Sequence, residues 1–351
     1  MRTLALLFLA ALPVQAGDSL ETAVDRLVHA RRGAVVGMSV GVAHGDRVLL
    51  KGYGRVKLDP DVKPDADSVY EIGSVSKVFT GVLLAILAGD GTVRLDQPVQ
   101  ELLPDSVKVP AFNERRITLL DLTTHTAALP RMPTNFAPED STNPYADYSV
   151  ERMYAFVSAW KLPYAPGSKY LYSNLGAGFL GHALARRAKK SYEGLLVARI
   201  ADPLGMKSTR ITLTDDMRRR LAAPHKRSLE PGHTWDIPTL AGAGGIRSTA
   251  RDMLAFLRAN LSGKHALAEP LALARKVHFT GPPRLGLGWH IGQDGSRWHN
   301  GQTGGYHAFA AIDTKRRRAV VILSNTANGV PDVLGRQILA MPAVQPVERA
   351  K

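Results

Sequence analysis

The chain has 351 residues, enough for one large domain or two smaller ones, and its 45% hydrophobic and 22% charged residues are ordinary for a globular protein. It contains no cysteine, which excludes a disulfide framework, a thiolate metal site and a cysteine nucleophile. The net charge is +14, but the basic runs are scattered over 186–190, 218–220 and 315–318. Nucleic-acid binding requires a concentrated basic face, so we expect no nucleic-acid partner and at most a weak attraction to anionic envelope polymers.

Residues 1–16, MRTLALLFLAALPVQA, have the pattern of a secretory signal peptide. Arg2 supplies the positive start, Leu4 to Leu12 form the apolar core, and a small-residue cleavage site ends at Ala16. A core of about nine residues is far shorter than the roughly 20 that span a bilayer, which argues against a membrane anchor. We therefore expect cleavage after Ala16, a periplasmic or secreted protein, and no stable membrane insertion.

The first predicted elements are a helix over 19–32 and an antiparallel hairpin. The hairpin joins two β-rich runs, 35–43 and 47–56, through a turn that contains Gly45. The segment that follows Ser74 is apolar nearly all round and ends near Gly89. A helix that is apolar on every side is buried centrally, so this segment is expected in the core.

The middle of the chain, about 95–225, is predicted to be helical with Pro-containing loops, including a long loop over 132–148. Thr118 and Thr249 are each followed three residues later by an aspartate, which predicts a capping box at two helix starts. The C-terminal part returns to strands and ends with one more helix. Its predicted strands cover 286–293, 296–301, 305–313 and 318–325, and the helix covers about 330–340.

Strands at both ends of the chain and helices between them predict an α+β fold, in which one antiparallel β-sheet is flanked by helices and carries an inserted, mostly helical region. We expect residues 17–345 to form a single unit. Its sheet part would comprise about 17–84 and 226–345, and its helical part about 85–225.

The first candidate motif is EIGSVSKVFTG, residues 71–81, in which Ser74 precedes Lys77 by three positions on one face of the predicted helix. A serine hydroxyl needs a base to remove its proton, and a partly desolvated lysine can be that neutral base. The helix N-terminus would add N–H donors and positive potential around an attacked carbonyl. The spacing alone is a weak signal, because Ser158 and Lys161 repeat it on what we interpret as ordinary helix surface.

Two further motifs lie downstream. Tyr172-Ser173-Asn174 offers a phenol that can exchange protons beside a lysine and an amide that can both donate and accept hydrogen bonds. The alternative is a tyrosine packed in the core and an asparagine that caps the following helix. Residues 299–312, HNGQTGGYHAFAAI, predict a strand, a glycine-rich turn and another strand. Glycines such as Gly301 allow a ligand or another backbone to come close, and a plain hairpin is the alternative.

In this order and spacing, the three motifs resemble those of the active-site serine β-lactamase and penicillin-binding protein superfamily, and in particular the class C β-lactamase branch with its esterases and D-peptidases. The stretches LDQPVQELLP, ITLLDLTTHTAALP and PLGMKSTR extend the resemblance over roughly 20–340, so 17–345 would be one catalytic unit. The resemblance implies an acyl-enzyme on Ser74, proton transfer by Lys77 and Tyr172, and no cofactor. Which of those two is the general base stays open.

The resemblance also implies an oxyanion hole made by the backbone N–H groups of Ser74 and Gln302, and a substrate-binding role for Asn174. The third motif departs from the family pattern, because His299-Asn300-Gly301 replaces the usual Lys-Thr-Gly. A histidine of ordinary pKa, about 6.5, is mostly neutral at pH 7, which weakens a fixed positive site for a β-lactam carboxylate.

Met132 also departs from the family pattern, since class C enzymes often carry a polar amide-binding residue at about this position. We place His299, Asn300, Gly301 and Met132 on the substrate-binding surface. If His299 supplies charge, affinity for an anionic β-lactam should improve as the pH falls.

A zinc site on His290, His299 and His307 is disfavoured, because no helical histidine pair or carboxylate cluster accompanies them. The segment around Gly244 is not a phosphate loop and is expected to be a flexible loop near the site. Our leading hypothesis is an exported, metal-free serine hydrolase that opens β-lactam rings, with a small molecule as its partner. The alternative is an esterase or D-Ala-D-Ala-type peptidase acting on cell-wall fragments, and the third hypothesis is a non-catalytic envelope sensor.

Overall fold

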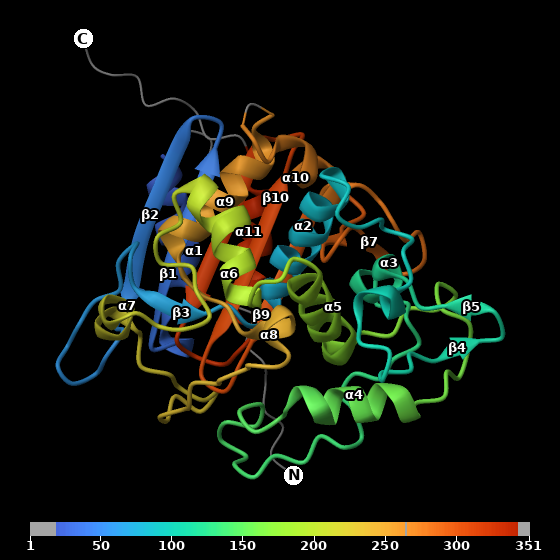
Figure 1. Cartoon of the computed structure of the whole chain (residues 1–351). Helices are drawn as coiled ribbons and strands as arrows, with labels where there is room; N and C mark the ends of the chain where they lie inside the picture. The colour runs from blue at the N-terminus through green and yellow to red at the C-terminus, as the bar shows by residue number, and fades with distance from the viewer. Residues whose placement is uncertain (1–18, 264, 343–351) are drawn as a thin grey trace, which may run out of the picture.

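The computed structural model describes residues 19–263 and 265–342, and the predicted signal peptide lies outside these residues. Its centre is a seven-stranded antiparallel sheet in the order β2-β1-β11-β10-β9-β8-β7 (Figure 1). The pairing of β1 with β11 brings the two ends of the chain into one sheet, which confirms the predicted fold class. The strands are β1 (Gly37–His44), β2 (Arg47–Gly54), β7 (Arg284–Leu285), β8 (His290–Ile291), β9 (Arg297–Gln302), β10 (His307–Asp313) and β11 (Arg318–Ser324).

Helices cover both faces of this sheet, and the side chains of its central strands alternate between two cores. On β11, Val320 and Ile322 belong to a core shared with α1 (Leu20–His29) and α11 (Val330–Ala340). The intervening residues of β11 belong to the larger core, which includes α9 (Ala250–Leu261). Every residue of β10 and β11 is buried, because side chains alternate along a strand and both faces are packed.

Helix α2 (Ser76–Gly89) lies between the sheet and the helical region, and every residue from Ser76 to Leu87 is buried. This confirms the prediction that the helix is central. The remaining helices are α3 (Leu119–Thr123), α4 (Val150–Ala159), α5 (Asn174–Arg187), α6 (Tyr192–Leu196), α7 (Asp215–Arg220), α8 (Ala241–Gly244) and α10 (Ala268–Arg275). Two small sheets pair β3 (Val69–Glu71) with β6 (Arg247–Thr249), and β4 (Ala111–Phe112) with β5 (Arg115–Arg116).

The strand predicted over 286–293 is wrong in its length, because only His290–Ile291 pairs there, as β8. The preceding residues turn back to β7 past the start of α2. Gly288 has a φ of +72°, and a Cβ at this position would lie 2.3 Å from the Lys77 carbonyl oxygen. The close packing against α2 therefore breaks the strand, and only glycine fits both the contact and the positive φ.

Both predicted caps form, but only one is a reciprocal capping box. At α3, Thr118 Oγ1 accepts from Asp121 N, and Asp121 accepts from Thr118 N. At α9, Thr249 caps Asp252 N, whereas the Asp252 carboxylate accepts from Ser208 N and the Thr209 hydroxyl. A tertiary contact thus takes the second carboxylate away from its own helix start.

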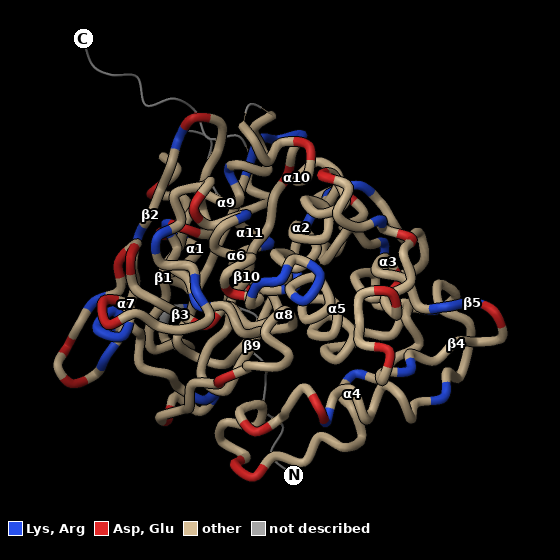
Figure 2. The backbone as a smooth tube through the Cα atoms, viewed as in Figure 1, with Lys and Arg blue, Asp and Glu red and all other residues tan. Residues whose placement is uncertain are grey.

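Two surface properties bear on the sequence predictions. Figure 2 shows Lys and Arg distributed over many elements and interspersed with Asp and Glu. Among the helices of residues 19–263 and 265–342, none has the length and hydropathy needed to cross a bilayer.

Candidate active site

Ser74 and Lys77 are in direct contact at the start of α2. Ser74 lies in a single 3₁₀ turn, η2 (Gly73–Val75), which leads into the helix. Lys77 Nζ lies 2.9 Å from Ser74 Oγ, 2.9 Å from Asn174 Oδ1 and 2.7 Å from the Ala243 carbonyl oxygen. The predicted pair therefore forms, and two more segments of the chain hold the amine in place.

Burial lowers the pKa of Lys77 well below its usual range, and the nearby charge of Arg131 adds to the effect. A neutral amine has two N–H bonds, which match the acceptors Asn174 Oδ1 and Ala243 O. Its lone pair is then directed to the remaining neighbour, the Ser74 hydroxyl. This arrangement makes Lys77 able to accept the serine proton.

Tyr172 also lies beside Ser74, and burial affects its pKa in the opposite sense. Burial raises the pKa of its phenol, and a hydrogen bond with Ser74 offsets part of that rise. Lys77 Nζ lies 4.8 Å from the centroid of the Tyr172 ring. With both groups neutral, the amine is the better base and the phenol is a proton donor.

The Tyr172-Ser173-Asn174 motif is fixed by the loop that follows α3. Ser173 N donates to His125 Nδ1 at 3.1 Å, Ser173 Oγ donates to the Pro130 carbonyl at 2.6 Å, and Asn174 N donates to the Arg131 carbonyl at 2.9 Å. Ser173, rather than the asparagine, caps α5 by accepting from Gly176 N. Asn174 is therefore free to bind Lys77 and does not serve as the cap.

The backbone of β9 lies directly against the turn that carries Ser74. A Cβ on Gly301 would lie 2.6 Å from Ser74 N and 2.1 Å from the Ile72 carbonyl oxygen. A Cβ on Gly73 would lie 2.8 Å from Gln302 N, and Gly73 has a φ of +49°. Two glycines thus allow the segments that carry the Ser74 and Gln302 N–H groups to face each other, as an oxyanion hole requires.

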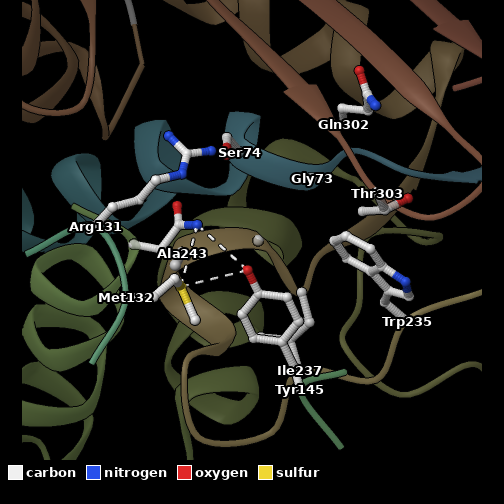
Figure 3. Close-up of a pocket in the computed structure, with 12 residues that line it drawn as sticks. Gly73, Ser74, Arg131, Met132, Tyr145, Trp235, Ile237, Ala243, Gln302 and Thr303 are labelled. Atoms are coloured by element: carbon white, nitrogen blue, oxygen red, sulfur yellow. Dashed lines mark hydrogen bonds between the residues drawn. The ribbon is translucent and has the colours of Figure 1, made fainter. Parts of the chain in front are cut away.

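Two hollows of about 350 and 340 Å³ adjoin Ser74, and both are lined by Arg131 and Gln302. The first also contains Asn174 and Met132, and Figure 3 shows the Tyr145 hydroxyl pointing to the Met132 sulfur, 3.7 Å away. The second contains Tyr172, Asn300, Gly301, His290 and His307. The structure thus brings most of the predicted site residues to one place.

The prediction for His299 needs correction. Its side chain is 1% exposed and lines neither hollow. Nδ1 lies 2.6 Å from the Asn300 carbonyl oxygen, while Nε2 is buried without a hydrogen-bond partner. Burial, together with the neighbouring His290 and Lys77, lowers the pKa of His299 well below its usual range. His299 is therefore a buried side chain of β9 whose surroundings favour the neutral ring, and it lines neither hollow beside Ser74.

Sequence reasoning missed several residues around Ser74. Arg131, Tyr145 and Trp235 line the first hollow from loops that have no regular pattern. His307 Nε2 lies 3.0 Å from Asp332 Oδ1, and Asn300 Nδ2 donates to Asp332 Oδ2 at 2.8 Å, so α11 supports the second hollow. The only sequence signal was that Arg131 follows directly on the family-like stretch ITLLDLTTHTAALP. Within the described residues, no group of three or more His, Asp or Glu side chains could hold a metal ion.

Comparison with known proteins agrees with this geometry. Residues 21–345 match the Beta-lactamase family. The chain is 31% identical to the D-alanyl-D-alanine-carboxypeptidase/endopeptidase AmpH of Escherichia coli (strain K12) over an alignment of 369 positions, gaps included. The alignment covers 95% of this chain and 94% of that protein. The chain is also 29% identical over 262 residues to a beta-lactamase of Pseudomonas fluorescens, and the match covers 73% of this chain and 70% of that protein.

Solved structures show the same fold. A beta-lactamase/D-alanine carboxypeptidase from Yersinia pestis is 25% identical, with a TM-score of 0.79 over 92% of this chain and 99% of that chain. A class C beta-lactamase is 23% identical and gives a TM-score of 0.81, and the match covers 93% of this chain and 97% of that chain.

Proposed function

The chain is a serine hydrolase that belongs to the Beta-lactamase family, and from this premise we propose that it is a D-alanyl-D-alanine peptidase that works through an acyl-Ser74 intermediate. One observation carries the proposal. A relative that matches along nearly the whole chain is named a D-alanyl-D-alanine-carboxypeptidase/endopeptidase, whereas the Pseudomonas fluorescens beta-lactamase matches about three quarters of this chain. The neutral, buried His299 adds support, because it removes the lysine charge expected of a typical class C β-lactamase.

The proposed reaction uses the neutral forms of both proton carriers. Lys77 takes the hydroxyl proton as Ser74 Oγ bonds to the carbonyl carbon of the penultimate D-alanine. The N–H groups of Ser74 and Gln302 stabilise the oxyanion, and one such donor contributes about 3 kcal/mol. The C–N bond then breaks, Tyr172 gives its proton to the leaving amine, and the same groups run in reverse when water attacks the ester.

β-Lactam hydrolysis is the second candidate, favoured by the beta-lactamase relatives. A β-lactam would acylate Ser74 by the same attack, and the two functions differ in how fast water releases the acyl group. We also propose that the protein acts in the periplasm or outside the cell, because residues 1–16 have the signal-peptide pattern.

The test compares two substrates on the purified protein. We expect release of D-alanine from an acylated L-Lys-D-Ala-D-Ala peptide with a higher kcat/KM than hydrolysis of a chromogenic cephalosporin. Intact mass should show a penicillin adduct on the wild type and none on Ser74→Ala. Faster cephalosporin turnover would replace the proposal with a β-lactamase, and a complete lack of turnover and acylation would favour the non-catalytic sensor.

A further inference from the structure

A peptide that ends in D-alanine carries a terminal carboxylate, and the site needs a cation to bind it. Among the residues described as lining the two hollows beside Ser74, there is no aspartate or glutamate, and Arg131 is the one lysine or arginine. Lys77 is buried beneath Ser74 and occupied by its three neighbours. The side chain of His299, on β9, is buried and lines neither hollow.

Arg131 is held in place by its backbone and leaves its guanidinium available. Its carbonyl accepts from both Asn174 N and Leu175 N, which fixes it to the first turn of α5. The guanidinium carbon lies 5.1 Å from the centroid of the Tyr172 ring. A cation–π contact positions the group without using its N–H donors. Figure 3 shows the guanidinium extending toward Ser74.

No carboxylate competes for Arg131 among the described residues. None of the ion pairs found there includes it, and Asp332, which contacts two residues of the second hollow, is already bound. One Asp332 oxygen accepts from Asn300 Nδ2 and the other lies 3.0 Å from His307 Nε2. The other nearby cation, Arg336, stacks on Trp298, with its guanidinium carbon 4.0 Å from the ring centroid, and lines neither hollow.

We propose that Arg131 binds the terminal carboxylate of the substrate and makes the enzyme selective for peptides with a free C-terminus. This inference rests on the proposed acyl transfer to Ser74. Arginine suits the role because its planar group offers two parallel N–H donors to a carboxylate. The position is also suitable, because Arg131 borders both hollows and so reaches either side of the nucleophile.

The test measures selectivity as a ratio, so that changes in the chemical step cancel. For each variant, kcat/KM is determined with an acylated L-Lys-D-Ala-D-Ala peptide and with the same peptide as its C-terminal amide. We expect the carboxylate-to-amide ratio to fall about 10- to 100-fold in Arg131→Gln, as for lost hydrogen bonds to a charged group. Arg131→Lys should give an intermediate ratio. Arg116→Gln, an exposed arginine on β5 that lines neither hollow, is the matched control and should keep the wild-type ratio.

A second pair of acylating compounds separates this inference from the proposed function. Rates of Ser74 acylation by benzylpenicillin and by its methyl ester are measured by intact mass, and the same fall in ratio is expected in Arg131→Gln. If the peptides are not cleaved but the penicillin ratio falls, the peptidase proposal fails and the role of Arg131 stands. Unchanged ratios in a folded Arg131→Gln protein would overturn the role of Arg131. A wild type that neither cleaves the peptides nor is acylated by either compound would overturn the acyl transfer to Ser74 on which that role rests.

Discussion

Lys77 is buried and Tyr172 is half-buried beside Ser74, and desolvation acts on their pKa values in opposite directions. It lowers the pKa of the amine and raises that of the phenol, so both side chains favour their neutral forms. A neutral amine accepts a proton and a neutral phenol donates one. The sequence left open which group is the base, and their shared desolvation supports our proposal that Lys77 activates Ser74.

The first prediction concerns the pH dependence of acylation. Because the pKa of Lys77 is depressed, its neutral form should persist to a lower pH than in an ordinary lysine, and the acylation rate should fall as the pH drops through that lowered pKa. Lys77→Arg keeps a cation that does not lose its proton, so acylation by a fluorescent penicillin should fall by about 10²- to 10⁴-fold at every pH. Lys161→Arg, in the same spacing after Ser158, is the control and should label normally. A Lys77→Arg protein that labels at the wild-type rate would remove Lys77 from the mechanism.

The second prediction concerns His299. Its buried ring favours the neutral form, so it should contribute nothing to the pH dependence of binding. The apparent affinity for an anionic β-lactam, measured between about pH 7.5 and 6, should therefore have the same slope in the wild type and in His299→Gln. A steeper gain toward low pH in the wild type alone would show that His299 becomes charged and meets the substrate.

At the scale of elements, the site depends on how closely β9 approaches η2. Backbone atoms of the two segments meet at Gly301 and Gly73, where there is no room for a side chain. The proposed oxyanion hole thus depends on the packing of β9 against the turn that carries Ser74. Any group that separates the two segments should weaken transition-state binding before it unfolds the protein.

The third prediction tests this packing with Gly301→Ala. The added Cβ would meet Ile72 O at 2.1 Å and Ser74 N at 2.6 Å, both backbone atoms that have no rotamer to change. We expect kcat/KM to fall about 10²- to 10³-fold, the effect of losing one oxyanion donor. Gly89→Ala is the control, since a Cβ at the end of α2 meets nothing within 4 Å. If Gly301→Ala retained full activity, the two N–H groups could not depend on this contact.

At the scale of the whole molecule, the site lies where the sheet meets the helical region. Ser74 comes from the start of α2, Tyr172 from the approach to α5, and Gln302 from the end of β9. The second core, under α1 and α11, lies on the opposite face of the sheet from α9. It supports the sheet without supplying any of these three residues.

The fourth prediction tests that second core. Leu334 in α11 is 0% exposed, so Leu334→Ala should lower the free energy of unfolding by about 2–5 kcal/mol, from lost transfer energy and the cavity left behind. The neighbouring Val333 is 47% exposed, and Val333→Ala should change the free energy of unfolding by at most about 0.5 kcal/mol. Urea unfolding measures both. Equal losses in the two variants would show that α11 does not pack as described.

The sequence alone determined the elements whose signals are local. The apolar segment after Ser74 predicted a buried helix, the Thr118 pattern predicted a capping box, and the runs over 305–313 and 318–325 predicted adjacent strands. Hydrophobic periodicity and capping depend on residues within one or two turns, so they can be recognised without a fold. The contact between Ser74 and Lys77 also needs only a single helical turn.

Only the tertiary structure decided the properties that depend on distant neighbours. The lowered pKa of His299 comes from its burial beside His290 and Lys77, and the exposed, unpaired position of Arg131 comes from its loop being tied to α5. The broken strand before His290 results from packing against α2. Charge states and close backbone contacts are set by surroundings that the fold gathers from far along the chain, so no local pattern could reveal them.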